Sequence, residues 1–382
     1  MILRFINGCV ATGSGVIGGA DIAVSNGFMT GISGLSNGPV ESEIDLEGGW
    51  LLPGFIDVQV NGGGGVLFND QLDVDAIATI GSAHARFGTT AFLPTLISDT
   101  PEHIAGALDA VDAAIEEGVA GVVGIHVEGP FINEVRRGIH EPDKIRRLDP
   151  EMLALLTRPR RGKVLVTLAP EQCSLEDIRT LVAHSVIVSA GHTNASYAQA
   201  MAAIDAGLSG FTHLFNAMSP LHHRDPGAVG AALDSSAWCG LIVDGVHLHP
   251  AAVRLAVQAK GIERIMLVTD AMPSVGSGAA DFMLQGKHIL VRDGACLFED
   301  GTLAGAHLDM ASAVRNTVET ANVSIVDAST MASASPAHFL SLFSERGEIA
   351  VGKRADWVWL GADLKPRATW IGGLAVEQLP VA

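Results

Sequence analysis

The sequence has few cysteines, few basic residues and no long apolar run. Its four cysteines, Cys9, Cys173, Cys239 and Cys296, are scattered without a close pair. This spacing argues against a disulfide framework or a zinc finger and favours a reducing cytoplasm. The chain has 24 Lys and Arg against 42 Asp and Glu, a net charge of −18. That charge argues against nucleic acid or an anionic membrane as the main partner.

Apolar runs are short throughout the chain. None reaches the roughly 18 residues of a membrane-spanning helix, so we expect no membrane span. The first ten residues, MILRFINGCV, contain one Arg and lead directly into strand-like sequence, so we do not interpret them as a signal peptide. With 382 residues, 48% of them hydrophobic, the chain can bury a large core, and one barrel plus a small domain fits this length.

Eight short apolar runs, separated by helical segments, make up the middle of the chain. Segments such as Ala198–Ala206 are rich in helix formers, and Asn194 or Ser196 can start this helix. This alternation predicts an α/β fold, a (β/α)8 TIM-type barrel with a buried parallel sheet. The predicted strands are Leu51–Val60, Thr89–Ile97, Val122–Glu128, Lys163–Ala169, Val186–Ala190, Gly210–His213, Trp238–Asp244 and Arg264–Thr269.

The two ends of the chain have a different pattern. In the first 50 residues short apolar runs alternate with Gly, Asn and Ser, which predicts a small β layer. Similar runs return after Gly347 and could complete this layer. Residues 13–18 match a GxGxxG pattern, but no clear strand precedes them and a strand follows, so a Gly-rich hairpin is expected instead of a dinucleotide site. Asp281–Asp300 is interpreted as an inserted hairpin.

Four chemically active side chains stand at the carboxyl ends of predicted strands. Glu128 ends the third strand, His192 and His213 end the fifth and sixth, and Asp270 ends the eighth. In a parallel barrel these ends share the catalytic face. One carboxylate and two imidazoles suit Zn²⁺ or a similar divalent ion and leave a position for water, whose pKa the ion lowers toward about 7. Asp270 can then act as general base and later as general acid.

Each of these residues also has an ordinary structural alternative. A histidine at a strand end is often a buried core group. Asp270 precedes Ala-Met-Pro and could cap a helix, and Glu128 could pair with Arg136 or Arg137 on the same loop. The common placement of all four at strand ends favours the metal site.

Seven segments of the sequence resemble one family of enzymes. They are similar, in order and across nearly the whole chain, to N-acetylglucosamine-6-phosphate deacetylases of the amidohydrolase superfamily. PGFID is shared widely in that superfamily, whereas the block 212–227 is specific to the deacetylases. The segments are PGFIDVQVNGGGG (53–65), HVEGPFI (126–132), GHTNA (191–195), THLFNAMSPLHHRDPG (212–227), VDGVHLHP (243–250), LVTDAM (267–272) and TLAGA (302–306).

The resemblance implies both an activity and a domain arrangement. The implied reaction is metal-dependent hydrolysis of the acetamide of N-acetylglucosamine 6-phosphate to glucosamine 6-phosphate and acetate, in amino-sugar metabolism. The implied small domain is a β-sandwich made from residues 1–50 and 345–382. Residues 51–344 would then form the catalytic barrel.

By position, the resemblance assigns roles to the residues at the strand ends. Glu128, His192 and His213 resemble the ligands of one divalent ion per chain, Zn²⁺ or else Fe²⁺, Co²⁺ or Mn²⁺. Asp270 resembles the catalytic acid and base, and His140 is similar to a catalytic histidine near the substrate carbonyl.

Further positions resemble the family's substrate-binding residues. Arg224 and His247 resemble phosphate contacts. The resemblance also implies a homodimer with the active site near the interface, in the cytoplasm that the cysteines favour. Arg224 offers a fork for phosphate oxygens, although a solvated loop around it is an open alternative. The full set is Ile139, Asn216, Ala217, Arg224, Asp244, Gly245, His247, Leu303, Ala304 and Gly305.

The sequence departs from the general superfamily pattern at the end of the first barrel strand. Many members have His-x-His there and bind two metal ions, whereas this chain has Gln59 and Asn61. Amides are poor ligands for transition metals compared with imidazole, so a single ion is expected.

Two other functions remain as alternatives. An amidohydrolase acting on a cyclic amide or an N-acyl amino acid would not need Arg224 or His247. A non-catalytic binding protein on a decayed barrel would have lost strand-end residues, and none of the four is missing.

Overall fold

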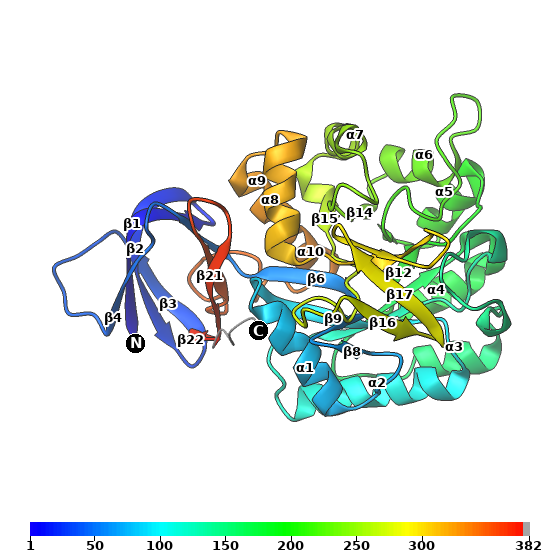
Figure 1. Cartoon of the computed structure of the whole chain (residues 1–382), viewed down its shortest axis with the longest axis horizontal. Coiled ribbons are helices and arrows are strands. Elements are labelled where there is room, and N and C mark those ends of the chain that lie inside the picture. Colours follow the sequence, from blue (N-terminus) through cyan, green and yellow to red (C-terminus); the bar gives the residue numbers. More distant parts are fainter. Residues whose placement is uncertain (377–382) are drawn as a thin grey trace.

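Eight parallel strands form the barrel of the computed structural model, which describes residues 1–376 (Figure 1). The last six residues of the predicted C-terminal segment, 377–382, lie outside the described residues. Each strand pairs with its neighbour in chain order, and this confirms the predicted (β/α)8 fold. The strands are β6 (Phe55–Val60), β9 (Thr89–Ile97), β10 (Gly124–Glu128), β11 (Lys163–Leu168), β12 (Ile187–Ala190), β13 (Gly210–Phe211), β14 (Trp238–Leu241) and β15 (Ile265–Leu267).

Helices alternate with these strands along the chain. Of the two predicted helix starts, Ser196 is the one that caps α5. Its side chain accepts from the Gln199 N–H and the Gln199 side chain accepts from the Ser196 N–H, which together form a capping box. None of the helices in residues 1–376 has the length and apolar character needed to cross a membrane. The helices are α1 (Val74–Ala85), α2 (Pro101–Glu116), α3 (Pro150–Leu156), α4 (Leu175–Ala183), α5 (Tyr197–Asp205), α6 (Gly227–Asp234), α7 (Pro250–Lys260), α8 (Met310–Ala321), α9 (Ile325–Ala332) and α10 (Ala334–Phe339).

The first predicted barrel strand, Leu51–Val60, was wrong in part. The chain changes sheets at Gly54, so that β5 (Trp50–Pro53) belongs to the terminal sheet and β6 starts the barrel. A side chain at Gly54 would collide with Thr90, so the crossing requires glycine. Both halves are largely buried and rich in apolar residues, which is why the pattern alone did not reveal the break.

The two ends of the chain form one hydrogen-bonded sheet, as the sequence predicted for a shared small β domain. β5 pairs antiparallel with β20, and this pairing joins the N- and C-terminal strands. Figure 1 shows β21 and β22 at the same end of the molecule as β1, β2 and β3. Phe5 packs edge-on against Trp357 and Trp370, with ring centroids 5.9 and 5.8 Å away. The other strands are β1 (Ile2–Thr12), β2 (Gly15–Ser25), β3 (Phe28–Ser33), β4 (Ser42–Asp45), β20 (Trp357–Leu360), β21 (Pro366–Ile371) and β22 (Leu374–Ala375).

Residues 13–18 form the turn between β1 and β2 and the start of β2, so the predicted hairpin is confirmed.

The predicted Asp281–Asp300 insertion is longer than expected. It forms a four-stranded antiparallel sheet that reaches Ala306, where Ala306 bridges to Ala271 beside the barrel. Its strands are β16 (Asp281–Leu284), β17 (Lys287–Arg292), β18 (Ala295–Leu297) and β19 (Leu303–Ala306), and a short hairpin of β7 (Gly62–Gly63) and β8 (Val66–Leu67) lies after β6.

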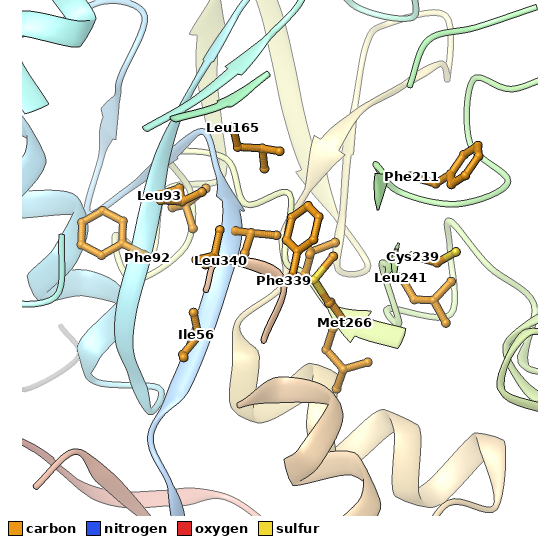
Figure 2. Close-up of a cluster of buried hydrophobic side chains, with 14 of the residues drawn as sticks. Ile56, Phe92, Leu93, Leu165, Phe211, Cys239, Leu241, Met266, Phe339 and Leu340 are labelled. Atoms are coloured by element: carbon orange, nitrogen blue, oxygen red, sulfur yellow. The ribbon is translucent and has the colours of Figure 1, made fainter. Parts of the chain in front are cut away.

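The main core fills the barrel and the layer between strands and helices. Figure 2 shows Phe339 and Leu340, at the end of α10, beside side chains such as Met266 and Leu93. α9 and α10 contact both β6 and β15, the first and last barrel strands. Each fully buried side chain of this size contributes roughly 1.5–3 kcal/mol. This packing supports the two strands that carry part of the candidate site.

Candidate active site

Three buried side chains converge at the carboxyl ends of β10, β12 and β13. His192 Nε2 lies 3.1 Å from Glu128 Oε1, and His213 Nε2 lies 3.0 Å from the same oxygen. The two Nε2 atoms are 3.0 Å apart. The structure therefore brings together the three residues that the sequence predicted as metal ligands.

This cluster fits a divalent cation. His192 Nδ1 lies 2.9 Å from the carbonyl oxygen of Arg136, which can only accept, so in a neutral ring Nδ1 carries the hydrogen. The Nε2 lone pair then faces a carboxylate oxygen, an arrangement that a cation between them would make favourable. Three atoms with mutual distances near 3 Å can all lie about 2.0–2.2 Å from one ion. A set of one oxygen and two imidazole nitrogens suits zinc and similar metals.

The tautomer of His140 suits hydrogen-bond donation into the site. Its Nδ1 accepts from the backbone N–H of Ser98 at 3.2 Å and lies 2.7 Å from the Ser98 hydroxyl. Burial and the nearby His192 hold the pKa of His140 well below its usual value, so the ring is neutral. Nε2 therefore carries the hydrogen. A cluster of Glu128, His140 and His192 also has ligand spacing, but this tautomer favours His140 as a donor.

Asp270 lies beside the cluster and is held by two amides. Its Oδ1 accepts from Asn61 Nδ2 at 2.7 Å and from Gln59 Nε2 at 3.0 Å. Gln59 Nε2 also lies 3.3 and 3.2 Å from the two oxygens of Glu128. Burial, followed by the charge of Glu128, raises the pKa of Asp270 to about 6. The two amides at the end of β6 therefore donate to the carboxylates.

The structural alternatives for two of these residues are excluded. No helix begins after Asp270; instead Ala271 bridges to β6 at Val60 and to Ala306. Neither arginine bonds Glu128, because Arg136 Nε donates to Asn194 and Arg137 Nη1 donates to the His140 carbonyl. Burial raises the pKa of Glu128, but the close approach of His192 and His213 outweighs it and holds that pKa well below its usual value.

A cavity of about 190 Å³ opens beside these groups. Six of the predicted substrate positions line it, and three lining residues, Ile97, Gly138 and Ile242, were not predicted. Ile97 ends β9 and Ile242 follows β14, so the strand-end position that revealed the histidines could also have indicated them. The six predicted residues are Ile139, Asn216, Ala217, His247, Leu303 and Gly305.

Comparisons with known proteins agree with this site. A model of the amidohydrolase family matches residues 50–376. The chain belongs to the amidohydrolase family. It is 44% identical to an N-acetylgalactosamine-6-phosphate deacetylase of Shewanella sp. (strain ANA-3), over 94% of this chain and 91% of the relative. It is 36% identical to an N-acetylglucosamine-6-phosphate deacetylase of Haemophilus influenzae, over 82% and 83% of the two chains.

Solved structures of amidohydrolases show the same architecture. The crystal structure of N-acetylglucosamine-6-phosphate deacetylase from Pasteurella multocida superposes with a TM-score of 0.94, at 34% identity, over 98% of this chain and 99% of that one. The deacetylase structure from Mycobacterium smegmatis gives a TM-score of 0.91 at 30% identity, over 99% and 100%. The resemblance noted in the sequence is thereby confirmed.

Arg224 lies outside the pocket of its own amidohydrolase chain. It is exposed on the loop that precedes α6, and this loop extends away from the barrel (Figure 1). The adjacent His222 and His223 rings lie 4.2 Å apart on the same exposed loop. Within one chain the structure therefore places Arg224 apart from the other substrate residues, because the loop projects outward, and its role as a phosphate contact stays a prediction.

Three other predicted substrate positions also lie outside the lining of the cavity. Ala304 is buried in the core under β16–β19, and Gly245 is exposed. Asp244 instead holds His247: its Oδ2 accepts from His247 Nδ1 at 2.6 Å, and its Oδ1 accepts from the backbone N–H of His247 at 2.8 Å. Burial raises the pKa of Asp244, but the bond from His247 outweighs it and the pKa is lowered. Asp244 thus orients a pocket residue.

Proposed function

We propose that this chain is a metal-dependent deacetylase that hydrolyses the acetamide of N-acetylglucosamine 6-phosphate to glucosamine 6-phosphate and acetate. The observation that carries the proposal is the buried triangle of Glu128, His192 and His213 beside Asp270, inside a cavity at the barrel's catalytic face. The relatives are named for deacetylation of N-acetylated hexosamine 6-phosphates, which supports this substrate class.

One divalent ion per chain, preferably Zn²⁺, would be held by Glu128, His192 and His213. When bound, it would supply Lewis-acid polarisation of the amide carbonyl and activation of water. Gln59 and Asn61 direct their N–H groups toward the carboxylates, and this orientation supports a single ion. Amides are poor ligands for transition metals compared with the imidazoles that would hold a second ion there.

Asp270 is proposed as the proton carrier. Its Oδ1 is occupied by two amide donors, and among the described residues no group bonds Oδ2. The free oxygen can accept the proton of the attacking water and later deliver it to the departing amine. His140 is proposed to donate Nε2–H to the carbonyl oxygen of the acetamide, where negative charge develops during attack.

The remaining pocket residues would bind the sugar. Asn216 and His247 offer polar groups, and Ile139 and Leu303 offer apolar contact. The 6-phosphate needs a cation, and the surroundings of a chain with net charge −18 do not favour an anion. Arg224 is suited to phosphate, but its exposed position means that it would act on the pocket of a second chain.

We therefore propose a homodimer with the active site near the interface. Three large apolar side chains are exposed on loops that adjoin pocket residues or Arg224: Val135 at 83%, Leu221 at 56% and Val246 at 41%. Apolar groups exposed around a pocket are typical of surfaces covered by a partner. The proposal includes a cytoplasmic location, which rests on the scattered cysteines, and a catalytic domain of residues 51–344 with a β domain from 1–50 and 345–382.

Acetate release from a small substrate panel tests this function. The panel contains the 6-phosphates of N-acetylglucosamine and N-acetylgalactosamine, free N-acetylglucosamine, a cyclic amide and an N-acetyl amino acid, with metal analysis of the same sample. We expect the highest kcat/KM with N-acetylglucosamine 6-phosphate. Equal or better turnover of the amide or the amino acid would instead indicate another amidohydrolase activity, and inactivity of the metal-loaded protein on the whole panel would contradict an enzyme of this class.

A further inference from the structure

The barrel has one seam where its first and last strands meet. β6 and β15 stand at the two ends of the strand order, and they form no ladder with each other in the described residues. Among the described residues, backbone hydrogen bonds join the two sides near the carboxyl ends of these strands. Asp270 N–H donates to the Gln59 carbonyl at 3.0 Å, and the Asn61 and Gly62 N–H groups donate to the Ala271 carbonyl at 3.0 and 2.9 Å. Asp270 and the two amides that bind it therefore stand on opposite sides of this seam.

Asp57 fills the seam below those contacts. Its carboxyl group is fully buried in the middle of β6. Oδ2 accepts from the Thr269 hydroxyl at 2.5 Å, and Oδ1 accepts from the backbone N–H of Thr269 at 3.3 Å and of Gln59 at 3.2 Å. Burial raises the pKa of Asp57 to about 7. One carboxyl group thus binds the residue directly before Asp270 and the residue whose side chain holds Asp270.

The backbone at Asp270 requires such support. Its φ of 51° lies in the left-handed region, which costs a non-glycine residue energy and persists only where neighbours impose it. The Thr269 hydroxyl also lies 3.2 Å from the backbone nitrogen of Ala271, which donates to it. The groups on both sides of Asp270 are therefore linked, through one hydroxyl, to Asp57.

We propose that Asp57 is a positioning residue for the deacetylation, which holds Asp270 in its reactive orientation by binding Thr269 across the β6–β15 seam. This inference rests on the proposed function. Asp57 is not among the residues that line the cavity, so it does not touch the substrate. Its effect should appear in the chemical step, because an error of about 1 Å in a catalytic group can cost roughly a hundredfold in rate.

Substitutions at Thr269 test the link with the least disturbance. Thr269→Val removes the hydroxyl and keeps the size, whereas Thr269→Ser keeps the hydroxyl. Thr317→Val is the matched control, because Thr317 is equally buried and its hydroxyl binds only within α8. The measurements are kcat, KM for N-acetylglucosamine 6-phosphate, and metal per chain, with Asp57→Asn as a second variant.

We expect Thr269→Val and Asp57→Asn to lower kcat by roughly ten- to a hundredfold, with KM within about threefold and metal content unchanged. Thr269→Ser and Thr317→Val should stay within about threefold of the wild type in all three measurements. An unchanged kcat in Thr269→Val would overturn the positioning role. So would a lower kcat that is accompanied by a raised KM and a loss of metal. If Asp57→Asn does not fold, Thr269→Val decides alone. A wild-type protein without sugar-phosphate turnover refutes the proposed function itself, and the positioning role falls with it.

Discussion

Replacement of Asp270 by asparagine separates chemistry from binding. Oδ1 of Asp270 accepts from Asn61 and Gln59 at 2.7 and 3.0 Å. An asparagine oxygen at the same place keeps both bonds, so the side chain should stay where it is. Its amide nitrogen then takes the place of Oδ2 and cannot accept a proton.

The expected loss is the whole general acid–base contribution. This contribution is roughly 10²- to 10⁴-fold in kcat, which corresponds to about 2.7–5.5 kcal/mol in the activation free energy of the hydrolysis. Stability should not fall, because burial, followed by repulsion from the charge of Glu128, raises the pKa of Asp270 to about 6, so its charged form is unfavourable in the folded protein. Above that pH, the neutral amide removes this repulsion, so the thermal midpoint of the metal-free variant should stay equal or rise.

The assay measures kcat, metal per chain, product affinity and thermal midpoint on one preparation of Asp270→Asn. Asp73→Asn is the matched control: Asp73 caps α1 by accepting from the Ala76 N–H at 2.8 Å, and asparagine is a comparable cap. The control should keep activity and stability. A kcat of Asp270→Asn within tenfold of the wild type would refute the proton-carrier role, and loss of the ion together with activity would make Asp270 a ligand.

Three further predictions follow from the same site and from the small β domain. Elemental analysis should find one divalent ion per chain, and chelation should abolish activity until metal is restored; two stoichiometric ions, one of them bound by Gln59 or Asn61, would contradict this. Arg224→Ala should lower kcat/KM for the phosphorylated sugar roughly tenfold or more, because a charge-assisted bond is worth about 1.5–3 kcal/mol, and leave the free sugar unaffected. If Arg224 serves the second chain's pocket, co-expression of Arg224→Ala chains with Asp270→Asn chains should restore part of the activity. An equal loss of kcat/KM on both sugars in Arg224→Ala would show that Arg224 does not bind the phosphate. Arg4 donates to Asp21 at 2.8 and 3.0 Å and lowers the pKa of the Asp21 carboxyl. The pair therefore stabilises the fold at pH values above about 4, the pKa of an aspartate in the unfolded chain, and this stabilisation is lost progressively as the pH falls below that pKa. The free energy of unfolding of Arg4→Gln should therefore lie below that of the wild type at pH 6, with a difference that narrows toward pH 3; a difference independent of pH would exclude the pair as its source.

The sequence was sufficient for the order of the barrel strands and for grouping the three candidate metal ligands. Strand and helix periods are local properties, and parallel strands place their carboxyl ends on one face whatever the exact packing. Glu128, His192 and His213 could therefore be grouped without coordinates. The family resemblance then supplied His140 and most of the pocket residues, because each follows a recognisable segment of chain.

Only the tertiary structure decided which way the remaining side chains point and what they bind. Asn61 and Asp270 are separated by 209 positions in the chain, and no local pattern indicates that an amide of one holds the carboxylate of the other. The same holds for Asp57, whose partner Thr269 lies across the barrel seam. Arg224 and Asp244 both matched family positions. Arg224 lies on a projecting loop outside the pocket of its own chain, and Asp244 binds His247 through a short hydrogen bond and orients it. Sequence patterns place residues on faces and at strand ends, whereas long-range contacts determine the direction and partner of each polar group.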